Sequence, residues 1–232
     1  MKSYHISGNH EKLISLNETI THKYLYDKQF LDSVKTKIDA FPLKQWERSK
    51  RNHNDYEYIY TSSKATKNIC SILPVSRSYF KIHEMILDFS LVEKNSYCAC
   101  VAEGPGGFIH CLNDYSKNEG VRIHKIFGIT LISDDSKIPY WNTSILKHKH
   151  NKVINGVDGT GDIYKLQNVD AFIQGIGFQY CHLVTADGGF DYSHDYNHQE
   201  ETSYKLLYSE IYIALNIQKM NGHFVLKVFD LF

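Results

Sequence analysis

The chain has 232 residues, of which 42% are apolar and 22% are charged, and its formal net charge is zero. This balance is typical of one globular α/β domain with an extension, and it excludes a protein that attracts polyanions through its overall charge. No apolar run reaches membrane-spanning length, the N-terminal sequence has no signal-peptide core and the five cysteines lack CxxC pairs, so we expect an intracellular protein with reduced cysteines, no metal site and no membrane partner.

The first 70 residues are predicted to form an N-terminal arm followed by a helical extension. Residues 1–22 are polar and aperiodic, whereas apolar residues recur at helical spacing over Lys23–Phe41, and Pro42 ends this run. The basic segment 44–53 carries one tryptophan, and it fits either a solvated helix face or a strip that binds RNA. In the second interpretation the cations contact phosphates and the aromatic ring stacks on a base. Taken alone, the segment favours the solvated face.

A helix is predicted after Pro74, with Ser76 as the residue that caps its first turn. Because this helix directly precedes the first strand, it can place a side chain over the ligand-binding edge of the sheet. Lys81 is the candidate, although a single lysine in such a position is ordinarily a solvated surface charge. The apolar side chains expected to face the core are Phe80, Met85, Ile86 and Phe89.

The most informative stretch is a strand, a glycine turn and a helix within residues 97–112. Tyr97–Ala102 is an apolar run of the length of a buried strand, and Glu103 closes it. Gly104–Gly107 form a turn at which a ligand can approach the bare backbone, and Phe108 begins the apolar side of the next helix. This combination is typical of the nucleotide-binding corner of an open α/β sheet. The turn is neither GxGxxG nor GxxxxGKS/T, so a dinucleotide or a triphosphate is not the expected ligand.

Two later acidic segments are predicted to reach the same edge of the sheet. The loop Gly156–Ile163 lacks the ligand spacing of a calcium loop, so an acid that bonds another ligand is the better interpretation. Asp187 closes the apolar run Cys181–Ala186 and is followed by two glycines. Since ligands of open α/β sheets bind beyond the carboxyl ends of the strands, we expect Asp187 in the cleft beside the glycine turn. Other strands are predicted at 125–131, 153–154 and 223–229, and a basic run at 147–152 fits either plain solvation or a phosphate contact.

The C-terminal part is predicted to hold an amphipathic helix and a strand that contains a lysine. Asn197 and Glu200 form a variant of the capping box that opens the helix. Lys227 lies within the apolar run His223–Phe229, where a charge is costly unless it has a partner. The alternation of strands and helices predicts a doubly wound, mostly parallel sheet with helices on both faces. The residues spaced along the apolar side of the helix are Leu207, Ile211, Ala214, Leu215 and Gln218.

Together these features resemble the FtsJ-like ribose 2′-O-methyltransferases. The resemblance covers residues from about 44 to 232 and rests on the segments SRSYFKIHE, AEGPGGF, FGITL, TADGGFDYS and GHFVLKVFDLF. It is closest to the mRNA cap branch of eukaryotes and large DNA viruses. Glu103 is a conservative departure, because the first strand of the family more often ends in Asp. The resemblance implies a Rossmann-like methyltransferase core over residues 71–232, after an extension over residues 1–70.

The resemblance also implies S-adenosyl-L-methionine as the cofactor, and it implies the site residues. Lys81, Asp187 and Lys227 match the first three members of the family's Lys-Asp-Lys-Glu tetrad. The glutamate and the strands that usually follow have no match before Phe232, so we expect a core that is truncated after strand five. The residues implied for cofactor binding are Glu103, Gly104, Pro105, Gly106, Gly107, Phe108, Asp158, Asp162 and Asp187. The candidates for RNA binding are Arg48, Lys50, Arg51, Arg77, Lys147 and Lys149.

The implied activity is methylation of a ribose 2′-hydroxyl in RNA, and the expected substrate is the first transcribed nucleotides of capped mRNA. In this hypothesis Lys227 removes the hydroxyl proton or steers the hydroxyl, Asp187 orients Lys227, and Lys81 holds the ribose-phosphate. Two alternatives stay open: methylation of ribosomal or transfer RNA, and a non-catalytic module that binds RNA or a partner on a degenerate methyltransferase scaffold. Other capping proteins are expected partners. The expected location is the nucleus or the cytoplasm, or a viral factory if the source is a virus.

Overall fold

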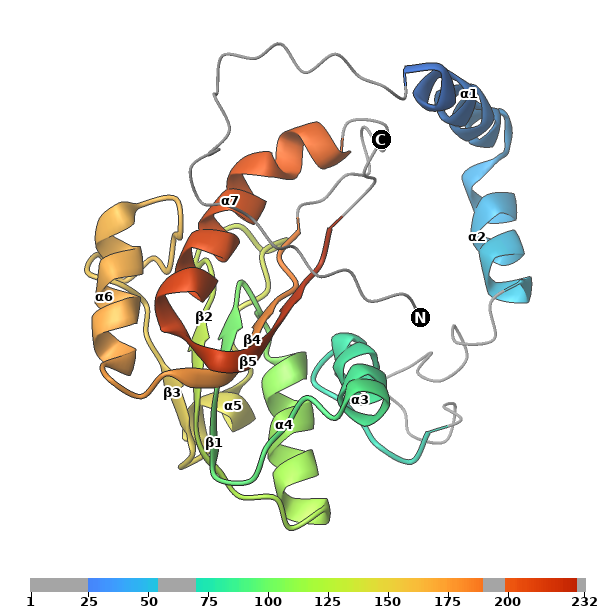
Figure 1. Ribbon diagram of the computed structural model, residues 1–232. Helices are drawn as coiled ribbons and strands as arrows, with labels where there is room; N and C mark the ends of the chain where they lie inside the picture. Colours follow the sequence, from blue (N-terminus) through green and yellow to red (C-terminus); the bar gives the residue numbers. More distant parts are fainter. Residues whose placement is uncertain (1–24, 54–69, 190–198, 229–232) are drawn as a thin grey trace. The chain divides into compact units, whose positions relative to one another are not determined.

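The computed structural model describes residues 25–53, 70–189 and 199–228, which fall into two compact units divided after Pro42 (Figure 1). The first unit is helical, as the apolar spacing of its sequence predicts, and the second begins with a helix over the basic segment and contains the sheet. In the described ranges, no helix has the length and apolar character needed to cross a membrane. The N-terminal helices are α1 (Leu25–Lys35), η1 (Thr36–Ala40) and α2 (Leu43–Asn52).

The second unit is built on a sheet in which every neighbouring pair of strands is parallel (Figure 1). The strand order is β3-β2-β1-β4-β5, so the chain winds outward from β1 on one side and then crosses to β4 on the other. In such sheets, ligands bind beyond the carboxyl ends of the strands at this switch point. The order confirms the predicted Rossmann-like α/β fold. The strands are β1 (Ser96–Val101), β2 (Ile123–Ile129), β3 (Asn151–Val153), β4 (Cys181–Ala186) and β5 (Gln218–Leu226).

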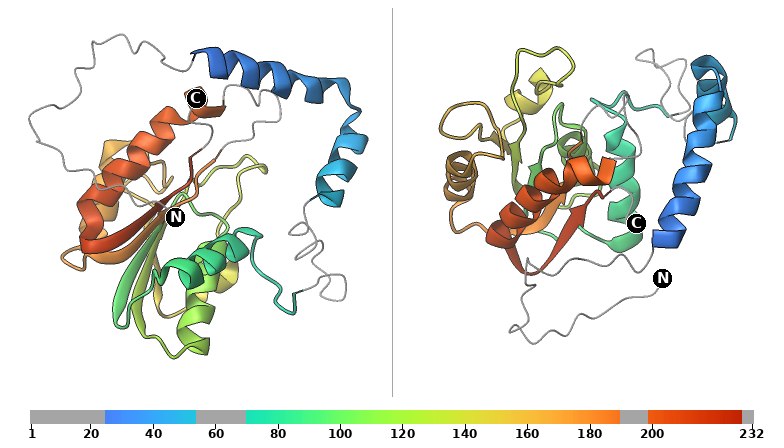
Figure 2. Two further views of the ribbon diagram at one scale, coloured as in Figure 1. Left: turned by 45° about the vertical axis from the view of Figure 1, so that its right-hand side comes forward. Right: turned by 90° about the horizontal axis from the view of Figure 1, so that it is seen from above.

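Helices cover both faces of the sheet, as predicted (Figure 2). Cys98 and Cys100 of β1 pack with α3, α4 and α5, whereas Ala99 and Val101 of the same strand pack with α6 and α7. A strand that is buried on both faces is apolar throughout rather than alternating, which is why the sequence shows a continuous apolar run here. The covering helices are α3 (Ser78–Phe89), α4 (Gly107–Asn118), α5 (Thr143–Lys147), α6 (Leu166–Ile176) and α7 (Gln199–Ile217).

Two local predictions about element ends were wrong. Ser76 does not cap α3 with its side chain: the residue before the helix, Arg77, has helical dihedral angles and makes no capping hydrogen bond. The strand β5 begins at Gln218 and ends at Leu226, so Lys227 follows the strand instead of lying inside it. Within β5, Asn221 has a positive φ of 63° at the place where the pairing with β4 shifts register.

The predicted apolar face of α7 was wrong except at Ala214, which is buried: the buried stripe is displaced by one residue along the helix. Ile211 is 40% exposed and Leu215 is 77% exposed. The buried side chains instead follow the spacing Ser203, Leu206, Glu210, Ile213, Ala214 and Ile217. The sequence contains two candidate stripes, and the one that is buried looks poorer because it contains a glutamate. The predicted cap at Asn197 lies outside the described residues.

Candidate active site

Asp187 follows β4 directly, and its carboxylate lies between two lysine ammonium groups. Lys81 Nζ is 3.3 Å from Asp187 Oδ2, and Lys227 Nζ is 3.1 Å from Asp187 Oδ1. Lys227 Nζ also donates a hydrogen bond to the backbone carbonyl of Asp187 at 3.0 Å. The Asp187 side chain is 12% exposed, whereas that of Lys81 is 54% exposed. The structure therefore brings together all three residues that were predicted to be catalytic, with Lys81 on the solvent side.

Strand register places Lys227 beside Asp187. Ala186 of β4 pairs with Leu226 of β5, and the N–H of Lys227 donates to the carbonyl of Ala186 at 2.9 Å, so the pairing extends one residue beyond the strand. Each of the two charged residues is thus the first residue after its strand. This puts both at the carboxyl edge of the sheet, where open α/β sheets bind ligands.

Packing between α3 and α4 positions Lys81. Tyr79 is buried and donates from its hydroxyl to Asp114 Oδ2 at 3.1 Å, which ties α3 to α4. Gly107 fits against Ser78 and the backbone N of Tyr79, and a side chain at Gly107 would collide with this end of α3. With Tyr79 and Ile82 held in the core, Lys81 lies on the exposed side of the helix, within reach of Asp187.

The glycine turn between β1 and α4 is held by a buried carboxylate. Glu103 is 4% exposed, and its Oε1 accepts a hydrogen bond from the Phe108 N–H at 2.7 Å. Burial raises the pKa of Glu103 to about 8, although N–H groups at the start of α4 act in the opposite direction. Glu103 Oε2 is buried without a hydrogen-bond partner in the part of the chain that the structure describes. Gly106 has a φ of 110°, a conformation that a residue with a Cβ rarely adopts.

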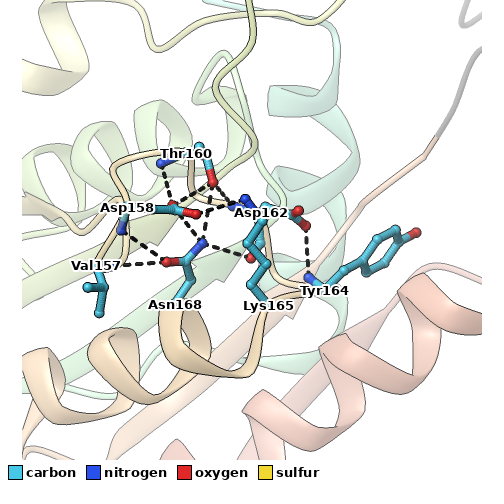
Figure 3. Close-up of polar contacts among 7 residues, drawn as sticks. All are labelled: Val157, Asp158, Thr160, Asp162, Tyr164, Lys165 and Asn168. Carbon is cyan, nitrogen blue, oxygen red and sulfur yellow. Dashed lines mark hydrogen bonds and ion pairs between the residues drawn. The ribbon is translucent and has the colours of Figure 1, made fainter.

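The loop after β3 is organised around Asp158 and Asn168 (Figure 3). Asp158 Oδ1 accepts from Thr160 N at 2.9 Å, Thr160 Oγ1 at 2.7 Å and Asn168 Nδ2 at 2.9 Å, and Asp158 Oδ2 pairs with Lys165 Nζ at 2.8 Å. The Lys165 ammonium and the Thr160 donors hold the pKa of Asp158 well below its usual range. Both carboxylate oxygens of Asp158 are therefore already engaged by groups within the loop and at the start of α6.

Asn168 binds the same loop from α6 and fixes the backbone of Asp162 (Figure 3). Its amide is completely buried, accepts from Val157 N at 3.0 Å and donates to the Asp162 carbonyl at 3.1 Å. The Asp162 carboxylate accepts the Tyr164 N–H at 2.9 Å through Oδ1. Of the two acids predicted in this loop, Asp162 has fewer side-chain hydrogen bonds within the loop than Asp158.

Thr130 connects this loop to the glycine turn. Its Oγ1 accepts the N–H of Gly104 at 3.0 Å. Gly161 packs directly on the Thr130 carbonyl, so that a Cβ on Gly161 would overlap it. Gly161 also has a φ of 62°. The loop residue before Asp162 and the first glycine of the turn therefore meet at one threonine just beyond β2.

One site residue was missed by sequence reasoning. Glu210 of α7 is completely buried, and its Oε1 accepts the N–H of Gly188 at 3.1 Å. Burial raises the pKa of Glu210 to about 7. The signal in the sequence is an acid at the centre of an apolar stripe, four residues after Leu206 and four before Ala214.

The residues predicted to bind RNA are spread over the chain. Arg48 and Lys50 are exposed on α2, and the side chain of Arg51 lies outside the described residues. Arg77 is exposed one turn before Lys81. Lys147 and Lys149 are exposed just before β3, which is the opposite end of that strand from the carboxyl edge, so the structure does not place them with Asp187. Lys149 lines a cavity of about 510 Å³ together with Lys117, His148 and His150.

The described residues contain no group of three or more histidine, cysteine, aspartate or glutamate side chains that could hold a metal ion. The arrangement at the carboxyl edge is instead an acid between two cations, beside a glycine turn with a buried acid. Such a site can bind an anionic group at the exposed Lys81, and it allows a ligand to lie close to the backbone of the glycine turn.

Comparisons with known proteins identify relatives of this chain. The family model described as FtsJ-like methyltransferase matches residues 74–232. The cap-specific mRNA (nucleoside-2′-O-)-methyltransferase 1 of Leishmania braziliensis is 27% identical over 211 residues, which are 88% of this chain and 52% of that protein. The protein of the same name from Mus musculus is 36% identical over 142 residues, which are 59% of this chain and 16% of that protein. The chain thus spans about half or less of the length of these relatives.

A solved structure described as a ribosomal RNA methyltransferase of Plasmodium falciparum is also similar. It has 16% sequence identity and a TM-score of 0.46, and the match covers 66% of this chain and 77% of that chain.

Proposed function

This chain belongs to the FtsJ-like methyltransferase family, and on that premise we propose that it transfers a methyl group from S-adenosyl-L-methionine to a ribose 2′-hydroxyl of capped mRNA. The observation that carries the proposal is the contact of Asp187 with both Lys81 and Lys227 at the carboxyl edge of β4 and β5. A methyl donor at the switch point between β1 and β4 would lie next to this cluster.

The chemistry asks little more of the protein than alignment and removal of one proton. A ribose hydroxyl is a weak nucleophile, and effective catalysis holds it in line with the methyl group while a general base takes its proton. We assign the removal of this proton to Lys227 Nζ, which Asp187 holds in place through its carboxylate and its carbonyl. Lys81 is the more exposed of the two lysines, and we assign it to the ribose-phosphate of the substrate.

The residues of the cleft fit S-adenosyl-L-methionine. A Cβ on Gly104 would collide with the Pro139 carbonyl and Thr130, and a Cβ on Gly106 would collide with Ile145, so the turn stays bare and a ligand can lie against its backbone. The buried Glu103 Oε2 is an acceptor without a hydrogen-bond partner among the described residues, and it suits the ammonium of the methionine part. Asp162 is the candidate for the ribose or the adenine. When bound, the cofactor supplies a methyl group that its sulfonium already activates.

Asp158 and Asp162, the two acids of the loop after β3, are assigned different roles toward the cofactor. Asp158 is already bonded by Thr160, Asn168 and Lys165, so we propose that it shapes the loop and leaves the ligand contact to Asp162. Asp187 stays in the cofactor set because its carboxylate is near enough to Glu103 of the glycine turn to raise the pKa of that residue. Pro105, Gly107 and Phe108 complete the turn, and the N–H of Phe108 is used by Glu103.

Capped mRNA is the proposed substrate because the relatives from Leishmania braziliensis and Mus musculus are cap-specific by name. Exposed Arg77, one helical turn from Lys81, is the proposed phosphate contact nearest the cluster. We propose that the remaining basic residues contact parts of the RNA chain that lie farther from the methylated nucleotide. These residues are Arg48, Lys50 and Arg51 on α2, and Lys147 and Lys149 before β3. Binding to other capping proteins and the compartment stay predictions.

Methyl uptake by matched transcripts tests the proposal. The protein is incubated with S-adenosyl-L-methionine labelled in its methyl group and with transcripts of one sequence, either capped or uncapped. We expect label in the 2′-O-methyl nucleoside of the capped transcript and little in the uncapped one. Equal labelling of both, or labelling only of ribosomal or transfer RNA, would contradict the cap assignment. No heat of S-adenosyl-L-methionine binding and no labelling of any RNA would favour a non-catalytic scaffold.

A further inference from the structure

Glu210 is a carboxylate in the middle of the buried face of α7. Its side chain is completely buried, and Leu206, Ile213 and Ala214 continue the same face with apolar groups. An acid in such a position costs free energy unless hydrogen bonds or charges compensate. Oε1 accepts the Gly188 N–H at 3.1 Å, and Oε2 has no partner among the residues that the structure describes. The compensation therefore comes largely from one peptide group.

That peptide group joins two parts of the active site. Gly188 directly follows Asp187, so a force on its N–H acts on the backbone that carries the central carboxylate. Gly188 is buried between α7 and the end of β1: a Cβ on it would collide with Glu210 Oε1, lie 2.9 Å from Leu206 Cδ2 and lie 3.0 Å from Ala102 Cβ. Ala102 immediately precedes Glu103 and has a positive φ of 54°. Glu210 thus holds Gly188 by a hydrogen bond, in contact with Ala102 at the end of β1, where the chain enters the glycine turn.

The charges around Glu210 belong to the same cluster. The ammonium of Lys227 favours the ionised form of Glu210, and the carboxylate of Asp187 disfavours it. Burial is the largest influence and brings the pKa of Glu210 to about 7. The side chain is therefore coupled to both members of the pair that we assign to proton removal.

We propose that Glu210 is a positioning residue of the active site, which holds the Asp187–Gly188 peptide so that Asp187 stays between Lys81 and Lys227 and next to the glycine turn. The proposal deepens the proposed function and rests on it for its kinetic consequence. It gives α7 a part in catalysis although none of its described side chains is assigned a contact with RNA or the cofactor.

Two substitutions separate positioning from simple packing. Glu210→Gln keeps an oxygen that can accept the Gly188 N–H, so we expect methyl transfer within about threefold of the wild type. Glu210→Leu fills similar volume without an acceptor, and replacing a buried charge by an apolar group is often neutral or stabilising. We expect the Glu210→Leu protein to fold, to keep its KM for S-adenosyl-L-methionine within about threefold, and to lose on the order of 10²-fold in kcat because the reacting groups are misplaced. Glu119→Leu, at an exposed acid beyond the end of α4, is the matched control.

Amide NMR gives a readout that does not depend on activity. In the wild type we expect the Gly188 amide proton to be shifted downfield and to titrate near pH 7 with Glu210, with Asp187 and Lys227 as the charged groups facing it. The titration should vanish in Glu210→Gln, and the downfield shift should vanish in Glu210→Leu. Unchanged Gly188 resonances in both variants, or full kcat in a folded Glu210→Leu protein, would overturn the inference. A wild-type protein without methyl transfer would instead overturn the proposed function while the NMR prediction remains testable.

Discussion

Lys227 contacts Asp187 twice, through the carboxylate at 3.1 Å and through the backbone carbonyl at 3.0 Å. Two acceptors from one residue fix the ammonium more firmly than a single ion pair, because the carbonyl is part of the backbone that continues β4. Lys81 reaches the same carboxylate from α3, and its side chain is the more exposed. The cluster therefore has a fixed cation at the edge of the sheet and an accessible one toward solvent.

Substitution of Lys227, the more buried lysine of the cluster, is expected to slow methyl transfer strongly. In Lys227→Met the side chain keeps an unbranched apolar stem but loses the amine, so it cannot take a proton or bond Asp187, and we expect kcat to fall by about 10²–10⁴-fold, the usual contribution of a general base. Single-turnover labelling of capped RNA measures the loss. Lys94→Met, at an exposed lysine in the turn before β1, is the control and should keep full activity. Activity of Lys227→Met close to that of the wild type would remove Lys227 from the mechanism.

Neutralising the central acid is expected to impair the reaction without unfolding the protein. Asp187→Asn keeps the shape and the backbone carbonyl but leaves Lys81 and Lys227 facing each other without a negative charge. We expect kcat to fall by about 10²-fold, because Lys227 loses its ion pair with the carboxylate and keeps only the hydrogen bond to the backbone carbonyl. Circular dichroism should show an unchanged fold, and Asp170→Asn, at an exposed acid of α6, should behave as the wild type. If Asp187→Asn methylates RNA normally, the acid does not orient the base.

The sequence predicted the charged cluster in two ways: the end of an apolar run placed Asp187 at the cleft, and the resemblance to the FtsJ-like family implied its two lysine partners. Asp187 follows an apolar run, and parallel strands bring their carboxyl ends to one edge. Lys227 was predicted inside its strand, because the apolar run continues beyond it, and only the structure shows that β5 ends at Leu226. The fold was predictable because continuous apolar runs between amphipathic stretches indicate a parallel sheet covered on both faces.

The buried face of α7, the roles of the two loop acids and the part played by Glu210 could not be predicted, because they depend on tertiary packing that leaves no local pattern in the sequence. Leu215 and Ile213 are equally apolar, and only the docking of α7 decides that Ile213 is buried. Asp158 and Asp162 look alike in a glycine-rich loop, yet Lys165 and Asn168 engage both oxygens of Asp158. Glu210 was missed because an acid at that spacing normally indicates the solvent side of a helix.

The side-chain amide of Asn168, which bonds several groups of the loop after β3, is expected to be important for stability. In Asn168→Ala the Val157 N–H and the Asp162 carbonyl lose their common partner, a completely buried amide, so we expect the free energy of unfolding to fall by about 1–3 kcal/mol. Urea denaturation measures this change. Gln167→Ala, at the exposed amide next to it in the sequence, is the matched control and should change stability little. A Gln167→Ala protein as unstable as Asn168→Ala would show that the helix, and not the amide, holds the loop.

The buried acid of the glycine turn predicts a stability that falls with rising pH. Burial raises the pKa of Glu103 from its ordinary value of 4.5 to about 8, so the folded protein binds a proton that the unfolded chain has released. Between these two values, stability decreases as the pH rises, because ionisation is more costly in the folded state. Glu103→Gln cannot ionise but can still accept the Phe108 N–H. We therefore expect Glu103→Gln to match the wild type in Tm near pH 5 and to exceed it near pH 9, with Glu119→Gln as an exposed control. A Tm difference that is the same at both pH values would mean that Glu103 does not carry this pH dependence.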